Sequence, residues 1–127
     1  MYNTLIKEAY KAFENSHSPY SNFKVGAALL TEDGKIYTGC NVENVSYGLT
    51  ICAERTAAVK AVSEGHKKFK NIAIVSSGGD YTYPCGACRQ FLAEFADETF
   101  EFILHNNKED QVKVVPIGEM LPYLFEL

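Results

Sequence analysis

The spacing of apolar residues changes from helical to strand-like early in the chain. From Tyr2 to about Asn15, apolar residues recur every three or four positions with charged residues between them, which predicts an amphipathic helix. Two strand-like segments follow, Phe23 to Leu30 and Ile36 to Val42. Because Asp33-Gly34 between them is a dipeptide typical of tight turns, these two strands should form a hairpin.

Helical and strand-like segments alternate through the rest of the chain. The segment from Cys52 to Glu64 has a narrow face of small apolar residues, with Thr50 as a candidate N-cap and Gly65 as a suitable C-terminal residue. A second helix is predicted from Pro84 to about Ala96, since proline suits the start of a helix. Strands are predicted at 72–76, 100–104 and 112–115, and a short helical segment from 118 to the end.

This order of elements predicts an α/β fold, a three-layer α/β/α sandwich with a mixed five-stranded sheet. The two β-α-β units in the middle of the chain imply parallel pairs. The last two strands are joined by only a few residues, too few for a parallel crossover, so they should be antiparallel. Gly26 and Gly39 lie inside predicted strands, which indicates a close backbone approach or a bulge at each. We expect residues 1–127 to form a single domain.

Composition and charge narrow the functional classes. Of the 127 residues, 46% are hydrophobic and 22% are charged, as in an ordinary globular chain. A net charge of −4 argues against a nucleic-acid partner, which normally requires a basic face. No apolar run approaches the roughly 20 residues that span a bilayer, and the charged N-terminal segment lacks a signal-peptide pattern. We therefore expect no membrane partner and a cytoplasmic location, where four cysteines favour metal binding or catalysis over disulfides.

Three of the cysteines stand at the predicted starts of two helices. Cys85 and Cys88 are three residues apart, so they share one helix face, and Cys52 begins the preceding helix. Free N–H groups and the positive end of the helix dipole lower a thiol's pKa there and favour the thiolate. Three protein ligands are typical of a catalytic Zn²⁺ that keeps its fourth position for water. The pattern therefore predicts one catalytic zinc.

The residues next to these cysteines suggest further roles. Glu54 is the carboxylate nearest to a predicted ligand, and a zinc-bound water needs a proton acceptor, although a helical glutamate is often only solvated. Arg55 is either an ordinary surface arginine or a donor to the thiolates that reduces their negative charge. Cys40 lies in a predicted strand, where it fits better as a small packed side chain than as a fourth ligand.

The polar loop before Cys52 contains a candidate sugar-binding pair. Asn41 and Glu43 offer an amide and a carboxylate, which can donate to and accept from hydroxyl groups. The negative charge of Glu43 also disfavours a phosphate, so the pair suits a neutral ligand with hydroxyl groups better than a phosphorylated one. The alternative is an ordinary polar turn, which is common for asparagine but accounts poorly for Glu43.

The chain resembles the small homotetrameric cytidine deaminases that act on free nucleosides. The resemblance covers nearly the whole chain and preserves the order and spacing of that family's motifs. The matching segments are Ser18-Pro19-Tyr20-Ser21-Asn22-Phe23-Lys24-Val25-Gly26-Ala27-Ala28, Gly39-Cys40-Asn41-Val42-Glu43-Asn44, Cys52-Ala53-Glu54-Arg55-Thr56-Ala57, Pro84-Cys85-Gly86-Ala87-Cys88-Arg89-Gln90 and Leu121-Pro122-x-x-Phe125.

The resemblance implies a zinc-dependent hydrolase that converts cytidine and 2′-deoxycytidine to uridine and 2′-deoxyuridine, with release of ammonia, in pyrimidine salvage. It also implies a homotetramer in which neighbouring subunits complete each site. The implied zinc ligands are Cys52, Cys85 and Cys88, with one Zn²⁺ per subunit, Glu54 as the proton shuttle and Arg55 beside the thiolates. The implied substrate-binding residues are Phe23 and the Ala53 backbone at the base, Asn41 and Glu43 at the ribose 3′-hydroxyl, and Val45, Tyr47 and Phe125 at the positions that neighbouring subunits supply.

Two alternatives remain at this point. An aminonucleoside deaminase of the blasticidin type shares the zinc motifs but lacks the Asn-x-Glu-Asn run found here at Asn41 to Asn44. A non-catalytic structural zinc module would use Cys40 as its fourth ligand.

Overall fold

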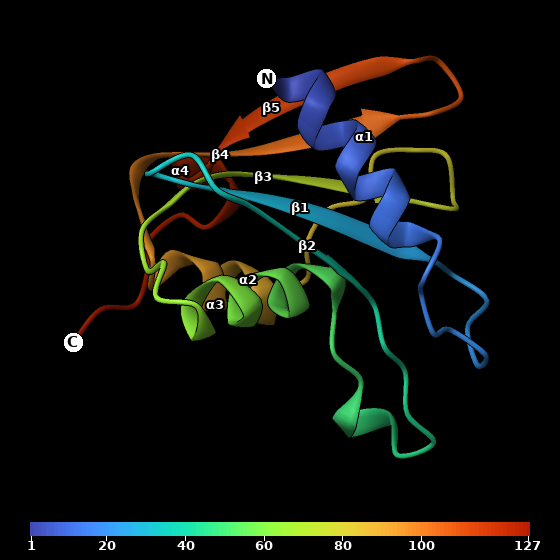
Figure 1. Ribbon diagram of the computed structural model, residues 1–127. Coiled ribbons are helices and arrows are strands. Elements are labelled where there is room, and N and C mark those ends of the chain that lie inside the picture. Colours follow the sequence, from blue (N-terminus) through green and yellow to red (C-terminus); the bar gives the residue numbers. More distant parts are fainter.

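Five strands form one mixed sheet in the computed structural model, which describes residues 1–127 (Figure 1). The spatial order of the strands is β2-β1-β3-β4-β5. The strands are β1 (Val25–Thr31), β2 (Ile36–Cys40), β3 (Phe69–Ser76), β4 (Ala96–Asn106) and β5 (Gln111–Pro116). The helices are α1 (Tyr2–Phe13), α2 (Ala53–Ser63), α3 (Gly86–Ala93) and α4 (Ile117–Met120), with a 3₁₀ turn, η1, at Tyr47–Leu49.

Pairing within the sheet follows the predictions except in the first β-α-β unit. Strand β1 pairs antiparallel with both β2 and β3, β3 pairs parallel with β4, and β4 pairs antiparallel with β5. The predicted hairpin and the antiparallel last pair are therefore confirmed. The expected pairing of β2 with β3 is wrong, because β1 lies between them. The two strands do run in the same direction, since each is antiparallel to β1. Only β3 and β4 form a parallel pair.

Helices cover both faces of the sheet, so the predicted three-layer α/β/α sandwich is confirmed. Figure 1 shows α1 on one face and α2 with α3 on the other. The alternation of side chains along β1 accounts for the two cores, since Ala27 and Leu29 pack on the side of α2 and α3. Ala28 and Leu30 pack on the opposite side with Leu5 of α1.

Two glycines allow a helix to lie unusually close to the sheet. A Cβ atom on Gly26 would lie 2.1 Å from the carbonyl oxygen of Ala9 in α1. A Cβ atom on Gly39 would lie 2.5 Å from the carbonyl oxygen of Ala53 and 2.5 Å from the amide nitrogen of Ala57, both in α2. The close backbone approach predicted at both positions is therefore confirmed. The contact at Gly39 fixes the first turn of α2 against the edge of the sheet.

The boundaries of several elements differ from the predictions. Cys52, not Thr50, is the N-cap of α2, and its backbone is extended with φ −71° and ψ 155°. Gly65 follows the helix with φ +93°, which explains the glycine there. The strands β3 and β4 begin at Phe69 and Ala96, earlier than predicted. Their first residues include polar ones, so the apolar pattern did not mark them as strand. None of the helices has both the length and the apolar character needed to cross a bilayer.

Candidate metal centre

Three cysteines from two helices meet at one edge of the sheet. Cys52 is the N-cap of α2, Cys85 is the N-cap of α3, and Cys88 lies in the first turn of α3. Their sulfur atoms all lie within 4.8 Å of one another. Neither N-cap side chain bonds to its own helix, so the sulfurs are directed to each other rather than used as caps. The sequence therefore correctly predicted that both helix starts converge.

The spacing of the sulfurs fits a tetrahedral metal ion. Two thiolates bound to Zn²⁺ at about 2.3 Å with tetrahedral angles lie about 3.8 Å apart. The Sγ atoms of Cys52 and Cys85 are 3.9 Å apart. Cys40 does not belong to this cluster, which comprises Cys52, Cys85 and Cys88 alone. A soft three-sulfur set with no fourth protein ligand is the donor set of a zinc site with an open position.

Contact among the three thiols favours ionisation of Cys52 over Cys88. The neighbouring Cys88 thiol lowers the pKa of Cys52 well below its ordinary value, and Cys52 in turn raises the pKa of Cys88. Arg55 contributes to the lower pKa of Cys52, because its Nη2 lies 3.8 Å from the Cys52 sulfur. The Nε of Arg55 is buried and has no hydrogen-bond partner. Arg55 thus lies against the thiols, as its hypothesised role requires, and is not an ordinary surface arginine.

Glu54 is a buried carboxyl group in the first turn of α2. The residue is only 4% exposed, so it is not the solvated helical glutamate of the alternative interpretation. Burial raises its pKa to about 7, the nearby Cys52 thiol also raises it, and Arg55 lowers it. A group that titrates near neutral pH can both accept and return a proton. The environment of Glu54 therefore suits a general acid and base.

Asn41 is buried, and most of its hydrogen-bonding capacity is already used. Its Oδ1 accepts from the backbone N–H of Val25 at 2.9 Å and from the hydroxyl of Ser16. Its Nδ2 donates to the carbonyl oxygen of Phe23 at 2.8 Å. An amide has two donors and two acceptor lone pairs, so one N–H remains. Asn41 therefore holds the chain around Phe23 and retains one donor for a ligand.

Glu43 is likewise bound to the loop at residues 18–23. Its Oε1 accepts from the backbone N–H groups of Tyr20 at 3.0 Å and Ser21 at 3.2 Å. Its Oε2 accepts from the Ser21 hydroxyl. The hydrogen bond from Ser21 is the main cause that lowers the pKa of Glu43. Ser21 lies in a matching sequence segment, but neither its bond to Glu43 nor that of Ser16 to Asn41 was predicted, because the partners are 22 and 25 residues away.

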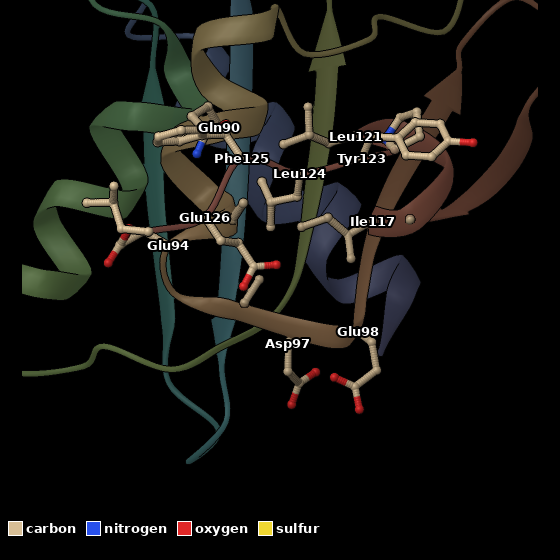
Figure 2. Close-up of a pocket in the computed structure, with 15 residues that line it drawn as sticks. Gln90, Glu94, Asp97, Glu98, Ile117, Leu121, Tyr123, Leu124, Phe125 and Glu126 are labelled. Atoms are coloured by element: carbon tan, nitrogen blue, oxygen red, sulfur yellow. The ribbon is translucent and has the colours of Figure 1, made fainter.

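The other residues predicted to contact the substrate lie in different parts of the structure. Ala53 is fully buried in the first turn of α2, and the Phe23 ring is partly exposed near Gly78. Val45 and Tyr47 are exposed on the loop before α2, which projects away from the sheet (Figure 1). Phe125 lies beside Gln90 in a cavity of about 830 Å³ that none of the three cysteines lines (Figure 2). A single chain therefore does not bring these three side chains to its own metal centre.

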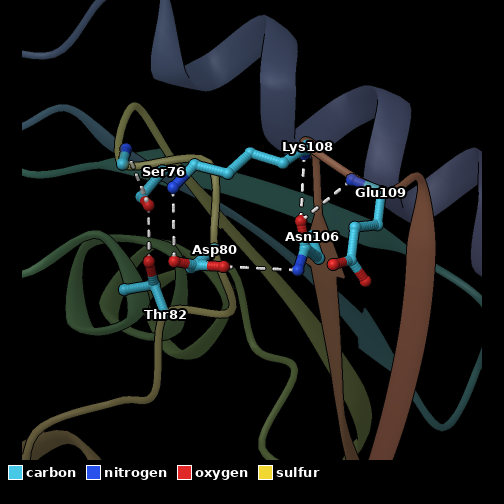
Figure 3. Close-up of polar contacts among 7 residues, drawn as sticks. Ser76, Asp80, Thr82, Asn106, Lys108 and Glu109 are labelled. Atoms are coloured by element: carbon cyan, nitrogen blue, oxygen red, sulfur yellow. Dashed lines mark hydrogen bonds and ion pairs between the residues drawn. The ribbon is translucent and has the colours of Figure 1, made fainter.

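A polar network fastens the segment that leads into Cys85. Residues 77–85 connect β3 to α3, and Figure 3 shows Asp80 of this segment joined to Asn106 and Lys108 where β4 turns into β5. Asn106 donates to Asp80 at 3.3 Å, and the backbone N–H of Asn107 donates to the carbonyl oxygen of Gly79 at 2.6 Å. Lys113 donates to the Tyr83 hydroxyl at 2.8 Å. None of these contacts was predicted from the sequence.

Arg89 connects the metal centre to the C-terminal region. Its Nε donates to the carbonyl oxygen of Pro84 at 2.8 Å, and its Nη1 donates to the carbonyl oxygen of Met120 at 2.7 Å. The residue directly follows Cys88, so these two bonds fix the start of α3 against the end of α4. The sequence motif contains Arg89, but nothing in its spacing indicated these carbonyl partners.

The fold and the site define a class of α/β proteins in which a zinc centre forms where two helices begin on one side of a mixed sheet. The model for the cytidine and deoxycytidylate deaminase zinc-binding region matches residues 1–104. The chain belongs to this family.

Individual relatives agree with that assignment. A cytidine deaminase from Sporosarcina psychrophila is 50% identical over 121 residues, which cover 95% of this chain and 88% of the relative. The crystal structure of a cytidine deaminase from Burkholderia pseudomallei has a TM-score of 0.91 and 47% identity, covering 98% of this chain and 99% of that one. A cytidine deaminase structure from Mycobacterium tuberculosis has a TM-score of 0.87 and 39% identity, covering 99% of this chain and 98% of that one.

Proposed function

We propose that this protein is a zinc-dependent cytidine deaminase that hydrolyses cytidine and 2′-deoxycytidine to the corresponding uridines and ammonia. The observation that carries the proposal is the juxtaposition of three sulfurs within 4.8 Å with a buried carboxyl group two residues from one of them. The full-length similarity to cytidine deaminases supports the choice of substrate. A cytoplasmic location stays a prediction from the sequence.

Glu54 performs the proton transfers in the proposed reaction. Zinc held by Cys52, Cys85 and Cys88 would supply a water molecule of lowered pKa beside the substrate. Glu54 takes one proton from the attacking water and delivers it to N3 of the pyrimidine while the C4–O bond forms. Glu54 then transfers the second water proton to the amino group, the C4–N4 bond breaks, and ammonia leaves. The net change is addition of one water and loss of one ammonia.

The chain's own polar residues suit a neutral nucleoside. Asn41 retains one unused N–H, which can donate to a sugar hydroxyl. Glu43 keeps acceptor capacity on Oε2, which accepts a single hydrogen bond. The negative charge of Glu43 also disfavours a phosphate group on the sugar. These features favour a free nucleoside over a nucleotide, with Phe23 and the Ala53 backbone at the base.

A homotetramer with shared sites is part of the proposal. Val45 is 77% exposed, Tyr47 is 75% exposed and Phe125 is 70% exposed, so large apolar surfaces are available for burial by other subunits. Cys85 is exposed, which leaves the metal centre open on one side. Neighbouring copies that place these three side chains over the site would close it. Analytical ultracentrifugation of the zinc-loaded protein tests the tetramer, and a stable monomer would contradict it.

Replacement of Glu54 provides the test of the reaction. The Glu54→Gln variant should keep one zinc per subunit and lose turnover of cytidine by at least about 10²-fold, because the amide cannot accept the proton. The decrease in ultraviolet absorbance reports conversion of cytidine to uridine, and atomic absorption reports zinc. Near wild-type turnover by a zinc-loaded Glu54→Gln protein would refute the proposal.

Replacement of Cys40 distinguishes catalysis from a structural zinc module. Cys40 lies in β2, outside the cluster of three sulfurs, so Cys40→Ala should retain zinc and activity. Cys85→Ala serves as the matched comparison, since it removes a proposed ligand by the same change of side chain. Loss of zinc from Cys40→Ala would favour the structural alternative.

A further inference from the structure

The hydroxyl of Ser21 joins two residues that the proposed function assigns to different parts of the substrate. It donates to Oε2 of Glu43 and accepts from the backbone N–H of Phe23 at 3.0 Å. A serine hydroxyl has one proton and two lone pairs, so both bonds form together without conflict. One side chain thus connects the carboxylate proposed to bind the sugar with the backbone of the aromatic residue proposed to face the base.

The chain at this point needs such a restraint. Asn22, between Ser21 and Phe23, has φ +58°, in the left-handed region that side chains other than glycine seldom adopt. Its backbone N–H donates to the carbonyl oxygen of Ser18 at 2.9 Å, which closes the turn. The residues of the turn are exposed, so its hydrogen bonds contribute much of what fixes its conformation.

Glu43 depends on the same turn for its orientation. Three of its hydrogen bonds come from Tyr20 and Ser21, and no cation forms a salt bridge with it. The Ser21 hydroxyl is the only partner of Oε2, so its removal frees that oxygen. The two backbone donors to Oε1 would remain. Loss of the hydroxyl should therefore allow the carboxylate to rotate rather than release it.

We propose that Ser21 is a positioning residue that orients the Glu43 carboxylate toward the ribose 3′-hydroxyl of the nucleoside. The inference rests on the proposed function and assigns a role to a residue that makes no contact with the reacting atoms. Ser21 acts through Glu43. The hydrogen bond that its hydroxyl accepts from the Phe23 N–H holds the turn beside the residue proposed to face the base. Its effect belongs to substrate binding, because Glu54 and the cysteine cluster lie on other elements.

Steady-state kinetics of three serine variants test this role. Ser21→Ala should raise KM for cytidine about tenfold, the size expected for a lost bond to a charged group. Its kcat should change by less than about twofold, because binding alone is affected. Ser21→Thr retains the hydroxyl and should restore most of the affinity. Ser63→Ala is the matched control, since that hydroxyl donates to the Lys60 carbonyl oxygen at the far end of α2 and should leave both constants unchanged.

A substrate without the 3′-hydroxyl separates positioning from general loosening of the loop. If Ser21 acts through Glu43 on that hydroxyl, Ser21→Ala should raise KM for 3′-deoxycytidine far less than it raises KM for cytidine. An equal increase for the two nucleosides, an unchanged KM, or equal effects of Ser21→Ala and Ser21→Thr would overturn the proposal.

The same experiment separates this proposal from the proposed function. Wild-type zinc-loaded protein that does not convert cytidine would refute both. Wild-type protein that converts cytidine, together with an unaltered Ser21→Ala variant, would refute only the role of Ser21.

Discussion

Gly39 of β2 and Ala53 of α2 are in backbone contact, and this contact positions the metal centre. A Cβ atom on Gly39 would lie 2.5 Å from the carbonyl oxygen of Ala53, much closer than real carbon and oxygen atoms approach. Ala53 lies between Cys52, a proposed ligand, and Glu54, the proposed acid and base. Any movement that relieves a clash at position 39 therefore displaces both functional residues.

Gly39→Ala should accordingly reduce both stability and activity. The opposing atoms belong to the backbone of α2, so they cannot move aside as a flexible side chain would. We expect the free energy of unfolding to fall by about 2 kcal/mol or more, and the remaining folded protein to show a lower kcat. Urea unfolding and the cytidine assay measure the two effects. Gly118→Ala is the control, because a Cβ atom there meets nothing within 4 Å, and an equally large loss in that variant would contradict the explanation.

Arg55 should affect turnover more than metal content. Its guanidinium lies 3.8 Å from the Cys52 sulfur and offsets the negative charge of the thiolates. Arg55→Gln should lower kcat/KM by about 10- to 100-fold, the usual cost of removing a partner of a metal ligand. Arg55→Lys keeps the charge and should lose less. Zinc analysis of each purified variant provides the comparison, and full activity of Arg55→Gln would show that the charge is unimportant.

The Asn106 side chain should stabilise the segment before Cys85 more than its charged neighbour does. Asn106 is 6% exposed, and its Oδ1 accepts from the backbone N–H groups of Lys108 at 2.9 Å and Glu109 at 3.1 Å. Asn106→Ala leaves these donors without their partner and should cost about 1–3 kcal/mol in unfolding free energy. Lys108→Ala removes an exposed ion pair with Asp80 and the packing of the lysine stem beside Gly79, and should cost less than about 1 kcal/mol.

The same two variants should differ in substrate binding. A Cβ atom on Gly78 would lie 3.0 Å from the Phe23 ring, so this segment supports the side of the pocket proposed for the base. We expect a higher KM for cytidine in Asn106→Ala than in Lys108→Ala. Equal KM values for the two variants would contradict this prediction, and equal unfolding free energies would contradict the ranking of their stabilities.

The metal centre was predictable from the sequence because its ligands follow local rules. Two cysteines three residues apart must share a helix face, and a helix start favours a thiolate wherever it occurs. The insertion of β1 between β2 and β3 was not predictable in this way, because it depends on which strands pair across the sheet. The use of Asn41 as a support for Phe23 and Val25 also escaped prediction, since those backbone partners are 18 and 16 residues away.

Glu43 should remain ionised well into the acidic range. Hydrogen bonds from Ser21 and from the backbone of Tyr20 favour the charged form and lower its pKa below the ordinary value of 4.5. A carboxyl group whose folded-state pKa is lowered stabilises the fold above its unfolded pKa, and that contribution disappears as the pH falls through the folded value. The loop at residues 18–23 should thus keep its conformation from neutral pH down to the unfolded pKa.

A carbon-13 NMR titration of the Glu43 carboxyl group measures this directly. Wild-type protein should titrate below pH 4.5, and Ser21→Ala should titrate at higher pH because the largest stabilising hydrogen bond is missing. Asp97, whose pKa is lowered by hydrogen bonds from Thr99, provides a reference carboxylate that Ser21→Ala should leave unchanged. An identical Glu43 pKa in the two proteins would mean that the Ser21 hydroxyl does not hold the carboxylate, whatever the kinetics of the variant.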